Sequence, residues 1–179
     1  MKLDAWRSAL AEDVVDLLAR LAQAEAAIAT LAEDRSLADE IAWPGMRIYE
    51  VPTLTYLPVL KAATADGFDQ AAVIAADAPD VPGLILGKLL RPLTSRAVAL
   101  APDDSGRAGL LGLAARLPAP DWLPEVDLDE AVAATVRAAA SRPAEVAVTP
   151  GWRRLRGPAD LATLDPAMEG WDTTRALLS

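Results

Sequence analysis

The first helix of this chain is visible in the spacing of its apolar residues. From Trp6 onwards they recur at Leu10, Val14, Leu17 and Leu21, every three to four positions, which is the pattern of an amphipathic helix packed along one face. Farther along, short apolar runs bounded by turn residues predict strands at residues 26–32, 46–51, 71–76, 97–101 and 145–149. Helical patterns or caps predict helices at residues 36–44, 55–65, 84–93, 109–116, 127–140 and 158–164.

Strands that alternate with helices favour right-handed crossovers and therefore a parallel sheet. The strand at residues 71–76 is apolar at every position, as expected for a strand covered by helices on both sides. Gly67 and Pro158 support the element boundaries, because glycine commonly ends a helix and proline suits the first helical turn. We therefore expect a single α/β domain over residues 1–179, with a mostly parallel sheet of about five strands and helices on both faces.

The amino-acid composition excludes several kinds of catalytic and metal site. The chain contains no cysteine and no histidine, which excludes thiolate nucleophiles, zinc–thiolate sites, the serine–histidine–aspartate triad and an imidazole base. Its formal net charge of −9 would repel phosphate backbones, so we expect no nucleic-acid partner. No apolar run is long enough to span a membrane, and the N-terminus lacks the apolar core of a signal peptide, which predicts a cytoplasmic protein. Abundant alanine, and arginine in excess of lysine, indicate a GC-rich bacterial gene.

The most informative motif is Asp77-Ala78-Pro79-Asp80, which follows the strand at residues 71–76. Ligands of open parallel sheets bind at the carboxyl ends of the strands. Asp77 and Asp80 are therefore in position to hold Mg²⁺ or Mn²⁺ and, through the metal, a diphosphate. The alternative interpretation is structural, since aspartates in this position also cap the next helix or form a turn before proline.

A second polar segment follows the strand at residues 97–101. It reads Pro102-Asp103-Asp104-Ser105-Gly106-Arg107. Its glycine permits close backbone approach, and Arg107 can meet a phosphate or a carboxylate. Alone, such a segment is more often a polar loop. If the two strands are neighbours, however, Asp77, Asp80 and Asp104 converge on one edge of the sheet and predict a site for a nucleotide or another phosphorylated small molecule.

Together these motifs resemble the nucleotide-diphosphosugar transferases of the glycosyltransferase A type. The resemblance lies in residues 73–81, in residues 102–113 and in Trp122. Within that superfamily the chain is most similar to the bacterial radical-SAM/selenodomain-associated transferases, with phospholactate and molybdopterin guanylyltransferases more distant. The resemblance implies a Rossmann-like fold and metal-assisted transfer from a nucleotide donor, with Asp77 in the place of the metal-binding acid.

Two departures from the family pattern bear on activity. Family members begin with a strand and a loop of glycine, lysine and arginine that grips the nucleotide, whereas this sequence begins at the helix that follows. Near the C-terminus, the family's aspartate-rich turn is replaced by Arg153-Arg154-Leu155-Arg156. These arginines either bind an anionic phosphate without a metal or pair with Asp77 and Asp80 as internal salt bridges. The predicted nucleotide-binding residues are Asp104, Arg107, Arg154 and Arg156.

The resemblance and its departures leave three interpretations. The first is a glycosyltransferase- or nucleotidyltransferase-like protein that lacks the nucleotide-binding strand and loop and has lost catalytic activity. The second is a non-catalytic structural or partner-binding module derived from that fold, in which a homodimer or a separate chain fills unpaired strand edges. The third is a coding sequence that begins upstream of Met1, where an in-frame glycine–lysine loop would restore the enzyme.

Overall fold

The computed structural model describes residues 3–179. Its α-helices are α1 (Leu3–Ala19), α2 (Arg35–Ile41), α3 (Tyr56–Ala65), α4 (Gly83–Leu90), α5 (Ala133–Ala139) and α6 (Asp172–Leu177). Its strands are β1 (Ala27–Thr30), β2 (Arg47–Glu50), β3 (Gln70–Ile74), β4 (Val98–Pro102), β5 (Leu110–Arg116) and β6 (Val146–Val148). No helix in this range is both long and apolar enough to cross a membrane.

The strands form two separate sheets. β1 and β2 make a parallel pair, and a second sheet has the order β3-β5-β4-β6. In the larger sheet β5 runs antiparallel to both β3 and β4, whereas β4 and β6 are parallel. The expectation of one mostly parallel sheet is therefore wrong. The fold is α/β with a parallel pair and a four-stranded mixed sheet.

The main error of assignment concerns β5. The helix predicted at residues 109–116 is instead a strand between β3 and β4, and every residue of that strand except Arg116 is buried. Burial on both faces removes the alternation of polar and apolar residues by which a strand is recognised. Gly112 packs so closely that an added Cβ would lie 2.7 Å from the side chain of Ile74 and 3.0 Å from that of Leu89.

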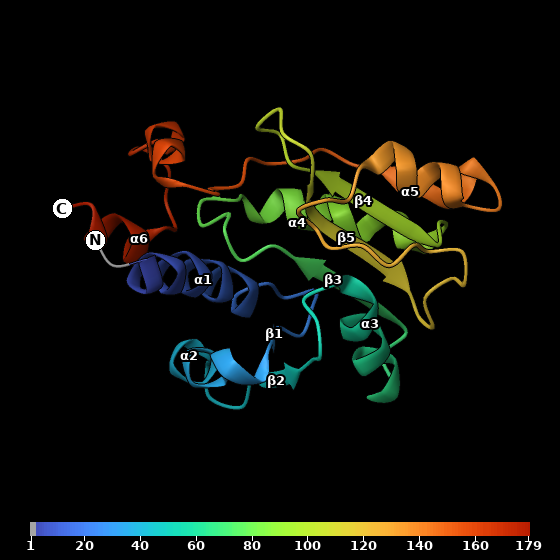
Figure 1. Cartoon of the computed structure of the whole chain (residues 1–179), viewed down its shortest axis with the longest axis horizontal. Coiled ribbons are helices and arrows are strands. Elements are labelled where there is room, and N and C mark those ends of the chain that lie inside the picture. The colour runs from blue at the N-terminus through green and yellow to red at the C-terminus, as the bar shows by residue number, and fades with distance from the viewer. Residues whose placement is uncertain (1–2) are drawn as a thin grey trace.

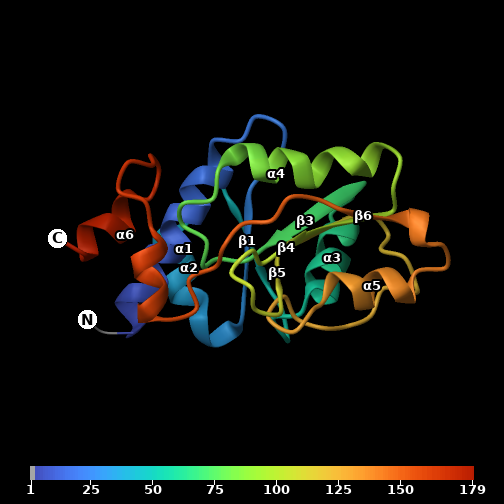
Figure 2. The ribbon, with the colours of Figure 1, turned by 90° about the horizontal axis from the view of Figure 1, so that it is seen from above.

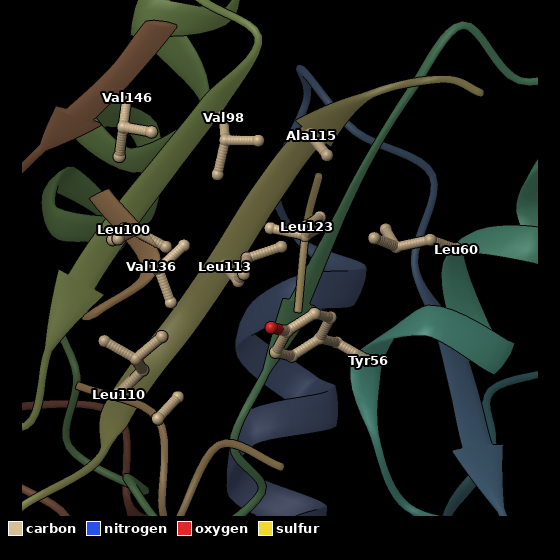
Figure 3. Packing of buried hydrophobic residues seen from close by; sticks show 11 residues of the cluster. Tyr56, Leu60, Val98, Leu100, Leu110, Leu113, Ala115, Leu123, Val136 and Val146 are labelled. Carbon is tan, nitrogen blue, oxygen red and sulfur yellow. The ribbon is translucent and has the colours of Figure 1, made fainter. Parts of the chain in front are cut away.

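Helices cover both faces of the larger sheet, as expected (Figure 2). On one face, Tyr56 and Leu60 of α3 and Val136 of α5 pack against Leu100 of β4 and Leu113 of β5 (Figure 3). On the opposite face, α4 packs against the sheet together with the C-terminal end of α1. The sheet therefore lies between two hydrophobic cores.

The first half of the chain follows the predicted pattern. The helices expected at residues 36–44 and 55–65 and the strands expected at residues 26–32 and 46–51 are present as α2, α3, β1 and β2. Gly67 has a φ of 86°, the left-handed conformation expected at the end of α3.

The helices near the C-terminus differ from expectation. α5 begins at Ala133, because Asp127 caps a separate turn by accepting the N–H of Glu130. Pro158–Thr163 forms a 3-10 helix, and α6 was not expected. The two ends of the chain pack together, since Asp13 in α1 holds the start of α6 (Figure 1).

Candidate functional site

The candidate site lies at the carboxyl ends of β3 and β4. Because both strands are antiparallel to β5, they run in the same direction and end at the same edge of the sheet. They are not neighbours as expected, since β5 lies between them. Residues 152–156 connect the two strand ends: Trp152 forms a parallel bridge with Asp103, and Leu155 donates its N–H to the carbonyl of Asp77 at 2.8 Å.

Arg154 is the centre of the site. Its Nε and NH2 donate to the two carboxylate oxygens of Asp77 at 2.6 and 2.8 Å, a bidentate pair. NH2 also lies 2.6 Å from Oδ1 of Asp129. NH1 donates to the carbonyls of Leu110 and Leu128 at 3.2 and 3.3 Å. With these contacts made, Arg154 is only 6% exposed.

The protonation of Arg154 follows from these contacts. Burial lowers the pKa of its guanidinium, because a buried charge loses its hydration. The hydrogen bond and charge of Asp77, followed by those of Asp129, act in the opposite direction and outweigh burial, so the pKa of Arg154 is raised above its ordinary value. Arg154 is therefore a permanent cation held between two carboxylates.

Asp80 has a different set of partners. Its Oδ1 accepts a hydrogen bond from the indole Nε1 of Trp152 at 3.0 Å, and its Oδ2 pairs with Arg153. The residue is 2% exposed. Asp77 and Asp80 therefore face different arginines.

The end of β4 contributes Asp103. Its Oδ1 accepts the backbone N–H groups of Ser105 and Arg154 at 3.0 and 3.3 Å, and its Oδ2 lies 3.0 Å from NH2 of Arg156. The guanidinium of Arg156 occupies the space beside Gly109, where a Cβ would lie 2.0 Å from NH2. Asp103 thus anchors both the backbone and a side chain of the segment that crosses the site.

The two other predicted nucleotide-binding residues lie on the surface. Asp104 is exposed, and its backbone N–H donates to the carbonyl of Trp152 at 3.2 Å. Arg107 is also exposed and donates to Oδ2 of Asp160 at 2.7 Å and to the carbonyl of Arg154 at 3.3 Å. The structure brings Asp77, Arg154 and Arg156 together, and it places Asp104 and Arg107 at the margin of this group.

These carboxylates do not fit a divalent metal in this arrangement. Asp77 already accepts two hydrogen bonds from Arg154, and Asp80 is occupied by Trp152 and Arg153. Across the residues that the structure describes, no cluster of three or more acidic side chains is arranged to hold a metal ion. The Mg²⁺ or Mn²⁺ site at Asp77 and Asp80 stays a prediction.

A large cavity opens beside the arginines. Its volume is about 1480 Å³, and Asp77, Asp129, Arg154 and Arg156 line one end of it. Mostly apolar residues of α1, α3, β1 and β3 line much of the remainder, together with polar residues such as Gln23, Arg47 and Gln70. The cavity exceeds the few hundred to about 1000 Å³ typical of small-molecule sites, so it extends well beyond the ion pairs.

Sequence reasoning missed Asp103 and Asp129. The predicted residue at this strand end is Asp104, but β4 extends to Pro102 and makes Asp103 the strand-end acid. The sequence predicts a helix over residues 127–140 that Asp127 or Asp129 caps, whereas α5 begins at Ala133. Nothing in the local sequence indicates that its carboxylate meets Arg154.

Solved structures with a similar fold exist. A protein described as a nucleotide-diphospho-sugar transferase from Desulfovibrio desulfuricans superposes with a TM-score of 0.67 at 18% identity, over 96% of this chain and 81% of its own. The 4-diphosphocytidyl-2C-methyl-D-erythritol synthase of Anaerococcus prevotii superposes with a TM-score of 0.64 at 11% identity, over 95% and 86% of the two chains. No family model matches the sequence, and no curated protein matches it. The chain therefore shares the fold of such transferases.

Proposed function

We propose that this chain is a nucleotide-sugar-transferase-like protein that does not catalyse transfer by itself, and that its strand-end acids hold the fold together instead. One observation carries the proposal: the bidentate pair of Arg154 with Asp77. Transfer assisted by a metal needs a carboxylate that is free to bind it. In this chain the carboxylate in that place is already neutralised by a buried arginine.

The other acids at the same edge support a structural role. Asp80 and Asp103 are each almost completely buried and each is paired with an arginine of residues 153–156. A buried carboxylate that loses its cation is left desolvated and unpaired, at a cost of roughly 3–5 kcal/mol. These pairs therefore attach the segment at residues 152–156 to the ends of β3 and β4.

A second candidate function is the binding of a phosphorylated small molecule without a metal. The supporting observation is Arg156, which borders the cavity and whose Nε makes no hydrogen bond with the described part of the chain, whereas its NH2 pairs with Asp103. A buried guanidinium N–H group without an acceptor favours an anionic ligand. A phosphate oxygen would satisfy it.

A single and a double substitution test the structural role. We expect Arg154→Met to lower the free energy of unfolding by roughly 3–5 kcal/mol, because Asp77 is left without its cation. Arg154→Met combined with Asp77→Leu should recover part of this loss, since no unpaired carboxylate remains. Arg35→Met, which removes an exposed pair with Asp39, is the control and should change stability by less than about 1 kcal/mol. Chemical denaturation measures all four proteins. A double variant no more stable than Arg154→Met would contradict the proposal.

Ligand binding separates the two candidate functions. Calorimetry with uridine, cytidine and guanosine diphosphates, with and without Mn²⁺, should show no binding that depends on Mn²⁺. Binding without the metal that is lost in Arg156→Met would favour the phosphorylated ligand. Binding that requires Mn²⁺ would show that Asp77 can exchange its arginine for a metal, and would overturn the proposed function.

A further inference from the structure

β6 is an edge strand of the larger sheet. In the described chain it pairs only with β4. At its two ends, the carbonyl of Glu145 and the N–H of Thr149 form backbone hydrogen bonds with the β4 segment at 3.0 and 2.8 Å. Backbone groups alternate between the two sides of a strand, so the N–H and C=O groups of Val146 and Val148 point away from β4.

An open groove runs beside this edge, between β6 and α5. Its volume is about 440 Å³, and its lining residues are Ala133, Ala134, Arg137, Ala138, Pro143 and Val148. Val148 is 49% exposed, and Val132, just before α5, is 44% exposed. The groove, which we call the β6 groove, therefore presents apolar side chains next to unpaired backbone groups.

The end of the β6 groove at the carboxyl end of α5 is basic. Arg137 is exposed in the last turn of α5, and Arg96 donates to a backbone carbonyl in the turn that precedes β6. Arg142 is already paired with Glu145 at 3.2 Å. Among the described residues Arg96 and Arg137 form no ion pair, so both of their positive charges are uncompensated.

The opposite end of the β6 groove is acidic. Asp127 and Glu130 precede α5, and the carboxylate of Asp127 accepts the backbone N–H of Glu130 at 2.8 Å. Neither carboxylate has an ion-pair partner in the part of the chain that the structure describes, whereas Asp129 between them is paired with Arg154. The groove therefore has acidic groups at the amino end of α5 and arginines at its carboxyl end.

A second copy of this chain is complementary to this surface. Two β6 strands related by a twofold axis run antiparallel, and an axis beside Ala147 places Val146 opposite Val148 of the second copy. The free N–H and C=O groups of the two strands then satisfy one another. The same rotation reverses α5, so the arginines at its carboxyl end lie toward the acidic residues before α5 of the second copy.

Small side chains on α5 permit close approach of the copies. Ala134 and Ala138 are exposed and lie one turn apart on the same side of the helix, and the distance between packed helices decreases with the size of the side chains at the contact. The net charge of −9 on each copy does not prevent this contact, because exposed charges more than about 8 Å apart are screened at physiological ionic strength.

These observations lead to one interface. We propose that two copies of this chain associate through β6 and α5, which joins their larger sheets into one continuous sheet. Figure 2 shows β6 and α5 at the end of the molecule opposite to the labels N and C. The proposed interface therefore involves neither end of the described chain.

Light scattering along a dilution series tests the association of the intact chain. We expect a dimer that dissociates on dilution. Val148→Lys should raise its dissociation constant by about tenfold or more, because lysine on an edge strand opposes pairing with another edge. Leu84→Lys is the matched control, since Leu84 is 68% exposed on α4, on the opposite face of the sheet, and it should leave the dimer unchanged. A wild type that is monomeric at every concentration, or equal effects of the two lysines, would overturn the proposal.

An exchange of charges tests the orientation of the two copies. Arg137→Glu places acid against acid across the axis, and Glu130→Arg places base against base, so each variant should weaken the dimer by about tenfold. The variant that carries both substitutions has opposite charges in contact again, and its dissociation constant should return to within about threefold of wild type. A double variant weaker than either single variant would show that α5 does not meet its copy in this way, and the proposed interface would be wrong.

Hydrogen exchange locates the pairing of the strands. The amides of Val146 and Val148 should exchange about tenfold or more slowly in concentrated than in dilute wild type. The amide of Thr149 is the internal control, because its hydrogen bond to β4 lies within one copy, and it should be protected at both concentrations. A dimer without protection at Val146 and Val148 would show that the copies meet elsewhere. None of these measurements depends on Arg154 or on nucleotides, so this proposal and the proposed function fail separately.

Discussion

Asp160 illustrates how one carboxylate organises the loop below the site. Its Oδ2 accepts hydrogen bonds from Arg107 at 2.7 Å and from the backbone N–H groups of Arg156 and Gly157 at 2.8 and 3.1 Å. The hydrogen bond from Arg107 lowers the pKa of Asp160 below its ordinary value of 3.8, burial opposes this, and the backbone N–H groups add to the lowering. The ionised form is therefore stabilised in the folded protein.

This shift predicts a pH dependence. A carboxylate with a lowered folded pKa contributes stability that is fully present above its unfolded pKa and lost as the pH falls through the folded value. Wild type should therefore exceed Asp160→Asn in stability by roughly 1 kcal/mol at neutral pH, and this difference should shrink below about pH 4. Thermal denaturation between about pH 2.5 and 7 measures it. The exposed Glu169→Gln is the control. A difference that stays constant into acid would contradict the assignment.

At single residues, the sequence located part of the site. The sequence predicts Asp77 and Arg154 as site residues, and pairing between them is one of its two alternatives for the arginines. The structure contains that pair. Asp103 and Asp129 could not be predicted in the same way. Their roles depend on Arg156 and Arg154, which lie far along the chain and reach these carboxylates only in the folded protein.

Among the elements, β5 is the most tightly packed. An added Cβ at Gly112 would meet Ile74, Leu89 and the carbonyl of Val73 at 3.0 Å or less. We expect Gly112→Ala to cost about 1–3 kcal/mol, because β3 and α4 must both move away from β5. Gly157→Ala is the control, since no atom lies within 4 Å of its added Cβ, and it should be close to neutral. Urea denaturation compares the two variants. A neutral Gly112→Ala would contradict the close packing of β5.

β5 also shows which elements could not be predicted from the sequence. α1 was predicted because it has one face on a core and the other toward solvent, which gives its apolar residues a period of three to four positions. β5 is buried on both faces and rich in leucine and alanine, so its residues suit a helix as well as a strand. Its position between β3 and β4 decides the conformation, because the backbone groups of both neighbours need partners.

Across the whole molecule, Asp13 joins the two ends of the chain. It is 5% exposed and accepts the N–H groups of Thr173 and Thr174 at 3.0 and 2.8 Å. We expect Asp13→Ala to cost about 1–3 kcal/mol, because these two buried donors lose their acceptor. Glu12→Ala on the same helix is the control and should have a smaller effect. Hydrogen exchange should show loss of protection confined to residues 171–178. Unchanged exchange there would mean that α6 is held by other contacts.

The sequence alone determined the local structure of the first half of the chain and the limits of the chemistry. Helix periodicity, the glycine that ends α3 and the absence of cysteine and histidine depend on residue types and on neighbours a few positions away. The tertiary structure decided which strands pair, which arginine meets which aspartate and that one edge of β6 stays free in the described chain. The physical reason is distance along the chain: Arg154 and Asp77, or β4 and β6, are brought together by packing of the whole molecule, which no local pattern encodes.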